Sequence, residues 1–313
     1  MKKNRITIIG ASILDVLAGP VNEQVFRTGS QAVERTGLSF GGDALNEGVV
    51  LSRLGMDVQL ISKVGRDEAG KRILEYAGKS GMDTTCILQE EGLATGINIV
   101  LIDERGERHF LTNPQSNLRK LCLEDILPHI DKMGEIVSFA SIFVSPLLDI
   151  QAMEQLFKKI KEKPGRILAA DMTKAKAGET LEDIKCLLPY IDYIFPNEEE
   201  IALLTGSRDN KRNAELLVES GVGCAVIKCG SRGCLIQRKE TVLEIPAYPV
   251  EKVVDTTGAG DCFTASFLWA ISQGWSLAEC GKFACSTASF VVEGMGAAEG
   301  IGSLEEILER YKK

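Results

Sequence analysis

Short apolar segments that end at glycine or at a polar turn alternate with segments of helical periodicity along most of the chain. Near the start, the apolar segment at residues 6–9 leads to Gly10, and residues 43–54, 58–62 and 67–80 then carry the patterns of a helix, a strand and a helix. From residue 136 onward, strand-like segments lie at 136–144, 167–171, 193–195, 225–229 and 234–237. Helical patterns occupy 150–163, 197–205, 210–220, 261–273, 276–292 and 303–312. This alternation predicts an α/β fold, with a mostly parallel central sheet flanked by helices on both faces.

Two segments near the N-terminus have a different character. Residues 96–102 and 108–112 flank a polar turn that contains Gly106, which is typical of a β-hairpin, and residues 21–40 are polar. We interpret these segments as a small β-sheet lid, inserted at about 11–40 and 93–116 into a single domain that spans residues 1–313. Because ligands of parallel α/β sheets bind beyond the C-terminal ends of the strands, we expect the functional residues in the turns that follow strands.

Composition excludes several classes of function. The 313 residues carry 36 Lys and Arg against 44 Asp and Glu, a net charge of −8, so nucleic acid is not an expected partner. No apolar stretch approaches the ~20 residues of a membrane-spanning helix, and the basic start lacks the apolar core of a signal peptide. The nine cysteines form no Cys-x-x-Cys pair, which favours small buried residues in a reducing compartment. We therefore expect a cytoplasmic protein without a membrane partner.

The most informative segment is the glycine-rich turn from Asp255 to Asp261, which opens a long apolar helix. The free N–H groups and the positive dipole end of such a helix bind anions, and phosphoryl groups are the common ligand. Asp261 would then face whatever approaches that anion. A simpler interpretation, in which Asp261 caps the helix and the glycines only form a turn, fits a bare Gly-x-Gly-Asp equally well. The second acid, six residues earlier, favours the functional interpretation.

Together with Gly41-Gly42-Asp43-Ala44-Leu45-Asn46, this segment resembles the two signatures of the PfkB, or ribokinase-like, family of carbohydrate and nucleoside kinases. Between the two signatures, residues 196–200 resemble the Asn-x-x-Glu element of that family, and residues 228–233 resemble its strand–turn nucleotide element. The resemblance covers nearly the whole chain and implies a ribokinase-like fold with a β lid.

The resemblance implies a reaction and its main groups. Asp261 would be the base that accepts the proton of the substrate hydroxyl, and the N–H groups of Gly258, Ala259 and Gly260 would form an anion hole for the transferred phosphoryl group. Phosphoryl transfer depends mainly on positioning and on charge stabilisation, so this arrangement suits the chemistry.

The resemblance also implies a nucleotide site. Asn197, Lys228, Gly230 and Gly233 would bind ATP, and Glu200 would hold Mg²⁺ through water, since Mg²⁺ gives up its water ligands reluctantly. An alternative for Asn197 and Glu200 is an ordinary helix start with a capping residue.

At the sugar end, the resemblance implies substrate contacts from Asp15, Gly42, Asn46 and Asn98. Many relatives bind a monovalent cation beside the anion hole, and Asp255 and Thr257 occupy the matching positions, so K⁺ activation is one option.

Two features depart from the family pattern. Asp43 stands where ribokinases often carry lysine, a form that is similar to the branch with 2-keto-3-deoxygluconate kinases. That branch has an Asp-Pro-Asn-x-Arg stretch, whereas this chain has Asp171-Met172-Thr173-Lys174, and a lysine does not replace a bidentate arginine clamp. This loss argues against a sugar acid as the substrate.

The sequence thus predicts an ATP-dependent kinase of a small sugar that forms a homodimer through its lids. Two alternatives stay open. A nucleoside kinase would use aromatic side chains against the base, and a sugar-sensing protein would keep the fold without catalysis.

Overall fold

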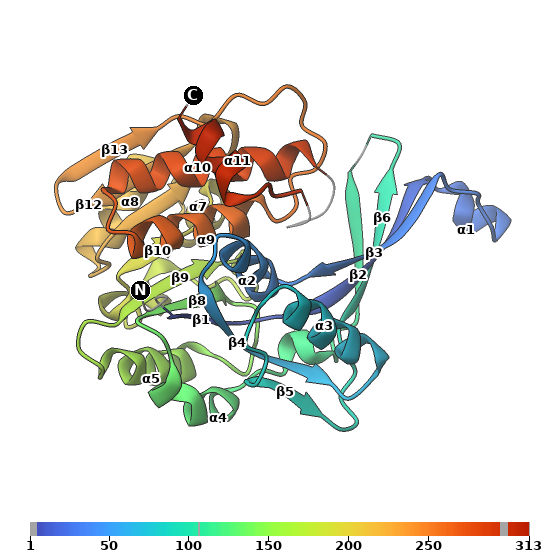
Figure 1. Cartoon of the computed structure of the whole chain (residues 1–313), viewed down its shortest axis with the longest axis horizontal. Helices are drawn as coiled ribbons and strands as arrows, with labels where there is room; N and C mark the ends of the chain where they lie inside the picture. Colours follow the sequence, from blue (N-terminus) through green and yellow to red (C-terminus); the bar gives the residue numbers. More distant parts are fainter. Residues whose placement is uncertain (1–4, 106, 295–299, 313) are drawn as a thin grey trace.

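The computed structural model describes residues 5–105, 107–294 and 300–312. Within these residues, nine strands form a central sheet in the order β13-β12-β11-β10-β9-β8-β1-β4-β5 (Figure 1). Neighbouring strands are parallel from β5 to β11, and β12 and β13 complete the sheet in antiparallel pairing. The strands are β1 (Arg5–Ile9), β4 (Asp57–Gly65), β5 (Ile87–Glu90), β8 (Ile136–Ile142), β9 (Ile167–Met172), β10 (Tyr193–Phe195), β11 (Ala225–Lys228), β12 (Cys234–Arg238) and β13 (Thr241–Ile245). The predicted α/β architecture is confirmed.

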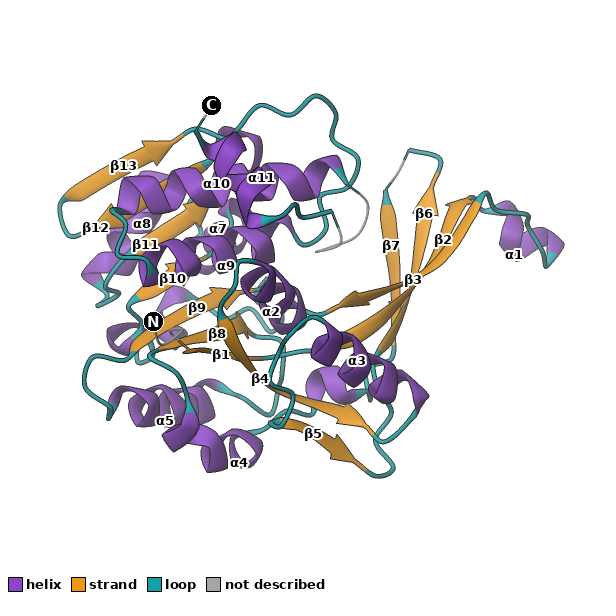
Figure 2. Cartoon of the chain, viewed as in Figure 1, coloured by secondary structure: helices purple, strands orange, loops and turns teal. Residues whose placement is uncertain are grey.

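Helices cover both faces of this sheet (Figure 2). One apolar core contains side chains of α2 (Asp43–Arg53), α3 (Glu68–Lys79), α9 (Ala259–Ser272), α10 (Leu277–Glu293) and α11 (Leu304–Tyr311). A second core contains side chains of α4 (Leu123–Ile126), α5 (Ile150–Lys161), α6 (Leu181–Ile184), α7 (Glu198–Thr205) and α8 (Asn210–Glu219). Short 3₁₀ helices are η1 (Asn117–Arg119), η2 (Leu127–Lys132), η3 (Leu188–Tyr190) and η4 (Gly230–Arg232).

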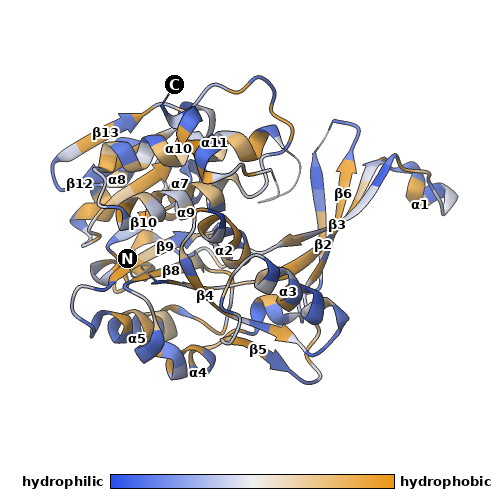
Figure 3. Ribbon diagram, in the orientation of Figure 1, coloured by the Kyte–Doolittle hydropathy of each residue, from blue (hydrophilic) through white to orange (hydrophobic). Residues whose placement is uncertain are grey.

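Alternation along each strand separates the two cores. In β1, Ile6 and Ile8 belong to the first core and Ile9 to the second, as the two-residue repeat of a strand requires. Burial on both faces explains why the strands are continuous apolar runs, which Figure 3 shows as hydrophobic colour along the central strands. Each fully buried isoleucine or leucine contributes about 1.5–3 kcal/mol to this packing.

In the described residues, a second sheet of four strands, in the order β3-β2-β6-β7, projects from the body (Figure 1). We call this sheet the lid. It consists of β2 (Ile13–Val21), β3 (Arg35–Gly41), β6 (Ile97–Asp103) and β7 (Arg108–Thr112), and α1 (Gln24–Thr28) connects β2 to β3. The hairpin expected at 96–112 is thus β6 and β7, whereas the segment described above only as polar contains α1 and most of β3. Because β2 and β6 are parallel neighbours, the formation of a strand at 13–21 depends on a partner strand about 80 residues away in the sequence.

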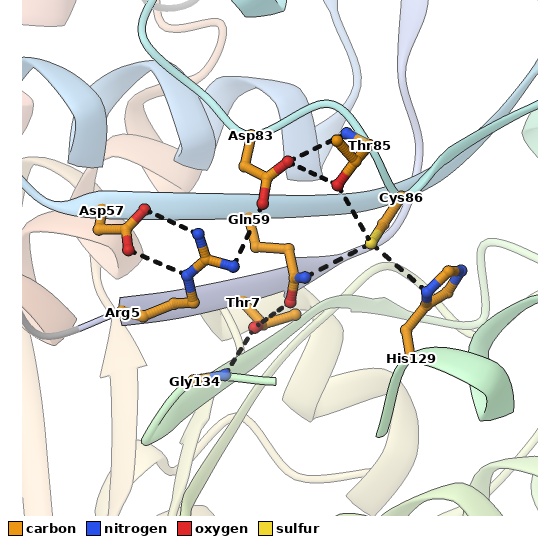
Figure 4. A network of polar contacts seen from close by, with 9 residues as sticks. All are labelled: Arg5, Thr7, Asp57, Gln59, Asp83, Thr85, Cys86, His129 and Gly134. Atoms are coloured by element: carbon orange, nitrogen blue, oxygen red, sulfur yellow. Dashed lines mark hydrogen bonds and ion pairs between the residues drawn. The ribbon is translucent and has the colours of Figure 1, made fainter. Parts of the chain in front are cut away.

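A polar network ties together the N-terminal ends of the central strands (Figure 4). Arg5 donates to Asp57 at 2.9 Å and lies 3.2 Å from Asp83, which also accepts the hydroxyl hydrogen of Thr85 at 2.6 Å. Partial burial alone would raise the pKa of Asp83, but the hydrogen bonds from Thr85 and the charge of Arg5 hold this pKa below its ordinary value. The charges and hydrogen-bonding groups of these side chains are therefore paired with one another.

The same network continues inward through neutral side chains (Figure 4). Thr7 donates its hydroxyl to Gln59 at 2.8 Å and accepts the N–H of Gly134 at 2.9 Å. The sulfur of Cys86 lies 3.4 Å from both the Gln59 amide nitrogen and Nδ1 of His129. Buried polar groups at this end of the sheet are thus used to join β1, β4, β5 and β8.

In the described residues, no helix combines the length and the apolar composition needed to cross a membrane.

Candidate active site

A cleft of about 890 Å³ lies where the lid meets the C-terminal ends of the central strands. Strands β8, β9 and β11 bring Ser141, Asp171 and Lys228 to its floor, and the lid contributes Ile13 and Phe110. Predicted site residues that line the cleft are Asp15, Gly42, Asn46, Asn98, Asn197, Glu200, Lys228, Gly230, Gly233, Thr257, Gly258, Ala259, Gly260 and Asp261. The predicted residues therefore come together in one cleft, apart from Asp255, which is not among its lining residues.

The glycine-rich turn forms the N-terminus of α9. Gly258 adopts a left-handed conformation (φ 73°) as the N-cap, and the helix begins at Ala259, two residues earlier than the sequence pattern indicates. Asp261 consequently lies in the first turn of α9, where backbone N–H groups have no acceptor within the helix. The N–H of Ala259 donates to the carbonyl oxygen of Thr256 at 3.3 Å, a long hydrogen bond, so an anion at this position would compete for that group and would also meet the positive end of the helix dipole.

The Asp261 side chain is held by a residue from the other signature. Asn46 in α2 donates its amide hydrogen to Asp261 Oδ2 at 2.7 Å, across a sequence separation of 215 residues. The early Gly-Gly and late Gly-x-Gly-Asp signatures thus meet through the packing of α2 against α9. In the absence of a substrate, the Asn46 amide orients the carboxylate of Asp261.

Several carboxyl groups lie close together around Asp261. Burial, followed by the charge of Asp43, raises the pKa of Asp261 to about 7, while the Asn46 hydrogen bond opposes this shift. Burial also raises the pKa of Asp43, a shift that its hydrogen bond with Ser141 opposes and the charge of Asp171 favours. A group that titrates near neutral pH is suited to accept a proton during a reaction.

One buried ammonium group balances this cluster. Lys228 Nζ lies 2.5 Å from Asp171 Oδ2, and the hydroxyl of Thr264 donates to the same oxygen at 2.7 Å. Burial alone would lower the pKa of Lys228, but the charges of Asp171 and Glu200 raise it. A side chain at Gly260 would begin 3.4 Å from Lys228 Nζ, so the ammonium group lies beside the start of α9.

Asn197 and Glu200 form the N-terminal capping box of α7. The Asn197 side chain accepts the Glu200 N–H at 2.9 Å, and Glu200 Oε2 accepts the Asn197 N–H at 2.7 Å. The capping interpretation is therefore confirmed, yet both residues also line the cleft. Burial raises the pKa of Glu200 to about 7, although the charge of Lys228 opposes this shift.

At the lid end, a chain of hydrogen bonds crosses three strands. Thr112 donates its hydroxyl to Asn98 Oδ1 at 2.9 Å, and Asn98 donates its amide to Asp15 Oδ1 at 3.0 Å. Burial raises the pKa of Asp15, whereas the Asn98 hydrogen bond and the charge of Arg108 oppose this shift. At Gly42 (φ 97°), a Cβ atom would lie 2.5 Å from the carbonyl oxygen of Ala11, so only glycine allows the start of α2 to approach the connection between β1 and β2 this closely.

Asp255 lies beside the cleft and is paired with the lid. Its carboxylate accepts the Thr257 N–H at 3.0 Å and forms an ion pair with Arg108 of β7. Sequence reasoning missed Arg108. It treated Asp43 as a departure from the family pattern, and it quoted Asp171 only as the first residue of a stretch that lacks the family's arginine. The acidic side chains of Asp43 and Asp171 were the signal that could have marked them as site residues, whereas no local pattern marked Arg108.

An α/β body whose helix N-terminus faces a carboxylate beneath a β lid defines a sugar-kinase type of fold and site. The family model of the pfkB family carbohydrate kinases matches residues 3–303, and the chain belongs to this family. It is 32% identical over 256 residues to an uncharacterized sugar kinase of Archaeoglobus fulgidus, an alignment that covers 80% of this chain and 97% of that protein. The protein is therefore an ATP-dependent kinase of the family that contains sugar and nucleoside kinases.

Solved structures agree in fold. The ribokinase of Arabidopsis thaliana, complexed with ribose and ATP, superimposes with a TM-score of 0.84 over 99% of both chains, at 23% identity. A candidate ribokinase II of E. coli, complexed with ATP and Mg²⁺, gives a TM-score of 0.83 over 99% of both chains, at 22% identity. The ribokinase-like fold is thus confirmed.

Proposed function

We propose that this kinase transfers the terminal phosphoryl group of ATP to a hydroxyl group of a small sugar, with Asp261 as the general base. The observation that carries the proposal is the position of Asp261, which lines the cleft in the first turn of α9 and is oriented by Asn46 at 2.7 Å. The base and the N–H groups that would stabilise the phosphoryl group therefore belong to the same helical turn.

This arrangement supports a defined sequence of events. The N–H groups of Gly258, Ala259 and Gly260 stabilise the negative charge on the phosphoryl oxygens, and the dipole of α9 adds to that effect. As the sugar oxygen bonds to the terminal phosphorus of ATP, the bond from that phosphorus to its bridging oxygen breaks, ADP leaves, and Asp261 accepts the proton of the sugar hydroxyl. A pKa of about 7 leaves a substantial fraction of Asp261 ionised at neutral pH and still basic enough to take that proton.

For the nucleotide, we propose that Lys228, Gly230 and Gly233 lie along the ATP phosphates and that Asn197 borders the same site. The lysine is buried beside the start of α9, which supports a role in neutralising phosphate charge. Glu200 offers a carboxylate oxygen in the cleft, the ligand type that Mg²⁺ prefers, so this residue fits the ion, directly or through water. Mg²⁺ would supply charge neutralisation on the transferred phosphate.

For the sugar, we propose a position between Asp15, Asn98 and the N-terminus of α2. Asp15 and Asn98 are nearly buried and already hydrogen-bonded to each other, so a sugar hydroxyl group meets a preorganised acceptor and donor. Gly42 permits the approach of the substrate to the backbone. A nucleoside would instead stack on an aromatic side chain, and Phe110 lines the lid side of the cleft, so nucleosides belong in the same test.

We also propose a homodimer through the lids. Leu38, Val16, Ile99 and Leu111 stand in register across the four lid strands. Because Asp15 and Asn98 face the cleft, their neighbours Val16 and Ile99 point to the opposite face of the lid, where Leu38, Ile99 and Leu111 are about half exposed. An apolar row of this kind is a docking surface for a second copy. Ile99→Glu should convert a dimer to a monomer in light-scattering measurements, and an unchanged mass would exclude this interface.

The function is tested by the release of ADP. The protein is incubated with ATP and Mg²⁺ and with single members of a panel of neutral sugars, sugar acids and nucleosides. We expect sugar-dependent ADP release and a phosphorylated sugar detected by mass spectrometry. If only nucleosides are phosphorylated, the substrate is a nucleoside and the proposed sugar is wrong. If no member of the panel increases the release of ADP, a sensing protein is favoured over a kinase.

A further inference from the structure

The lid contacts the phosphate end of the cleft through an ion pair. Arg108 lies on β7, the edge strand of the lid next to β6 (Figure 2), and its guanidinium binds the carboxylate of Asp255 in the body. The two side chains are only 15% and 7% exposed. A pair this shielded from water is stronger than a surface ion pair, and removal of one partner leaves the other charge buried.

The Asp255 carboxylate uses both oxygens. Oδ2 binds Arg108, and Oδ1 accepts the N–H of Thr257 at 3.0 Å. Thr257 directly precedes Gly258, the N-cap of α9. The guanidinium of the lid is therefore connected, through one carboxylate and one backbone hydrogen bond, to the turn that presents the N–H groups of α9.

These contacts do not fit the monovalent cation that the family resemblance suggests at Asp255 and Thr257. Such a cation needs the carboxylate as an oxygen ligand, but a guanidinium of the same unit charge already occupies it. Arginine keeps its proton at any accessible pH and binds carboxylates through a rigid fork of N–H groups, so the cation would have to displace a well-matched partner.

We propose that Arg108 takes the place of a monovalent cation in this kinase: it neutralises Asp255 and positions the turn that forms the anion hole. The proposal rests on the proposed function for the role of that turn. Arg108 is a positioning residue, because it acts through Asp255 and Thr257. Its charge also opposes the rise in the pKa of Asp15, so the guanidinium acts on the sugar end of the cleft as well as on the phosphate end.

The first test needs no variant. With the sugar found in the panel, ADP release by the wild-type protein is measured in KCl, NaCl and tetramethylammonium chloride at equal ionic strength. We expect kcat to agree within about twofold among the three salts, since the required positive charge belongs to the protein. Activation by K⁺ of about tenfold or more, a difference of about 1.4 kcal/mol in barrier height, would overturn the proposal.

The second test uses Arg108→Met. We expect kcat to fall by about tenfold or more with a smaller change in the KM for ATP, and K⁺ to restore part of the loss, because the vacated carboxylate can then accept a cation. Arg108→Lys should retain more activity than Arg108→Met. The matched control is Arg105→Met, which removes another lid arginine whose contacts, to Asp103 and Glu107, stay within the hairpin. An Arg108→Met protein with unchanged kcat would show that the pair is only structural.

A third measurement is independent of activity. The melting temperature of the wild-type protein should be the same in KCl and in tetramethylammonium chloride, whereas Arg108→Met should gain a stabilisation specific to K⁺. A K⁺-specific shift in the wild type would contradict the proposal. Failure of the proposed function looks different: no acceptor would then stimulate ADP release in any salt, whatever residue stands at position 108.

Discussion

The two ends of the central sheet use polar residues in opposite ways. At the N-terminal end, Arg5 forms ion pairs with Asp57 and with Asp83, and the pKa of Asp83 lies below its ordinary value because its partners stabilise the charged form. At the C-terminal end, burial and neighbouring carboxylates raise the pKa of Asp261 and Glu200 to about 7. Charged groups that are paired with opposite charges stabilise the fold. Carboxylates whose charged form is disfavoured by burial and by like charges are available to bind a ligand or a proton.

The largest expected effect of a substitution at either end is the loss of turnover in Asp261→Asn. The amide keeps the size of the side chain but cannot accept a proton, so kcat should fall by about 10³-fold or more, within the range for loss of a general base. Steady-state ADP release measures this change, and calorimetric titration with ATP checks that nucleotide affinity is retained. Activity within tenfold of the wild type would remove Asp261 from the role of base.

The next effect concerns pH. Since Asp261 must be ionised to act, kcat/KM should fall about tenfold for each unit of pH below its pKa of about 7. Stability should move in the opposite direction: a carboxyl group whose pKa is raised by folding favours the native state at low pH, and this contribution disappears as the pH rises through 7. Urea unfolding should therefore show Asp261→Asn to be more stable than the wild type at pH 8, with no difference near pH 4.

A smaller effect is expected for Asn46→Leu, which removes the hydrogen bond to Asp261 while keeping the number and branching of the heavy atoms in the side chain. Without that donor, the pKa of Asp261 should rise further, and kcat/KM at pH 7 should fall by about tenfold. The diagnostic observation is a shift of the acidic limb of the pH profile toward higher pH. A uniform loss of activity, with the limb unmoved, would assign Asn46 to sugar binding alone.

The smallest effect on activity is expected at the other end of the sheet. Asp83→Asn weakens the contacts to Arg5 and Thr85, so the free energy of unfolding should decrease by about 1–2 kcal/mol at pH 7. Because the pKa of Asp83 is lowered in the folded protein, this difference should shrink as the pH falls below 4. Below the melting temperature, kcat should equal that of the wild type. A loss of kcat comparable to that of Asn46→Leu would show that the polar residues at the N-terminal end of the sheet also serve activity and do not only stabilise the fold.

Local patterns explain which parts of the molecule the sequence predicted. The central strands are continuous apolar runs, and the glycine turn at 258–260 precedes a helix, so both features are visible within a few residues. A β lid was expected at about 11–40, but its individual strands β2 and β3 were not located, and the edge strands β5 and β13 were not predicted, since half-exposed strands depend on their partners. Contacts between distant residues were equally invisible: Asn46 and Asp261 are 215 positions apart, and Arg108 and Asp255 are 147 apart.

One feature of the lid bears on how this family diversifies. Strand β2 begins four residues after β1 ends, and β3 passes through Gly42 directly into α2, so the small sheet is an outgrowth with short roots in the body. If the proposed roles hold, most substitutions on the lid would alter the choice of acceptor and leave the ATP-binding residues of the body unchanged. Selection of the acceptor and handling of the nucleotide could then evolve at separate rates, except at Gly42 and Arg108, where the lid and the body are joined.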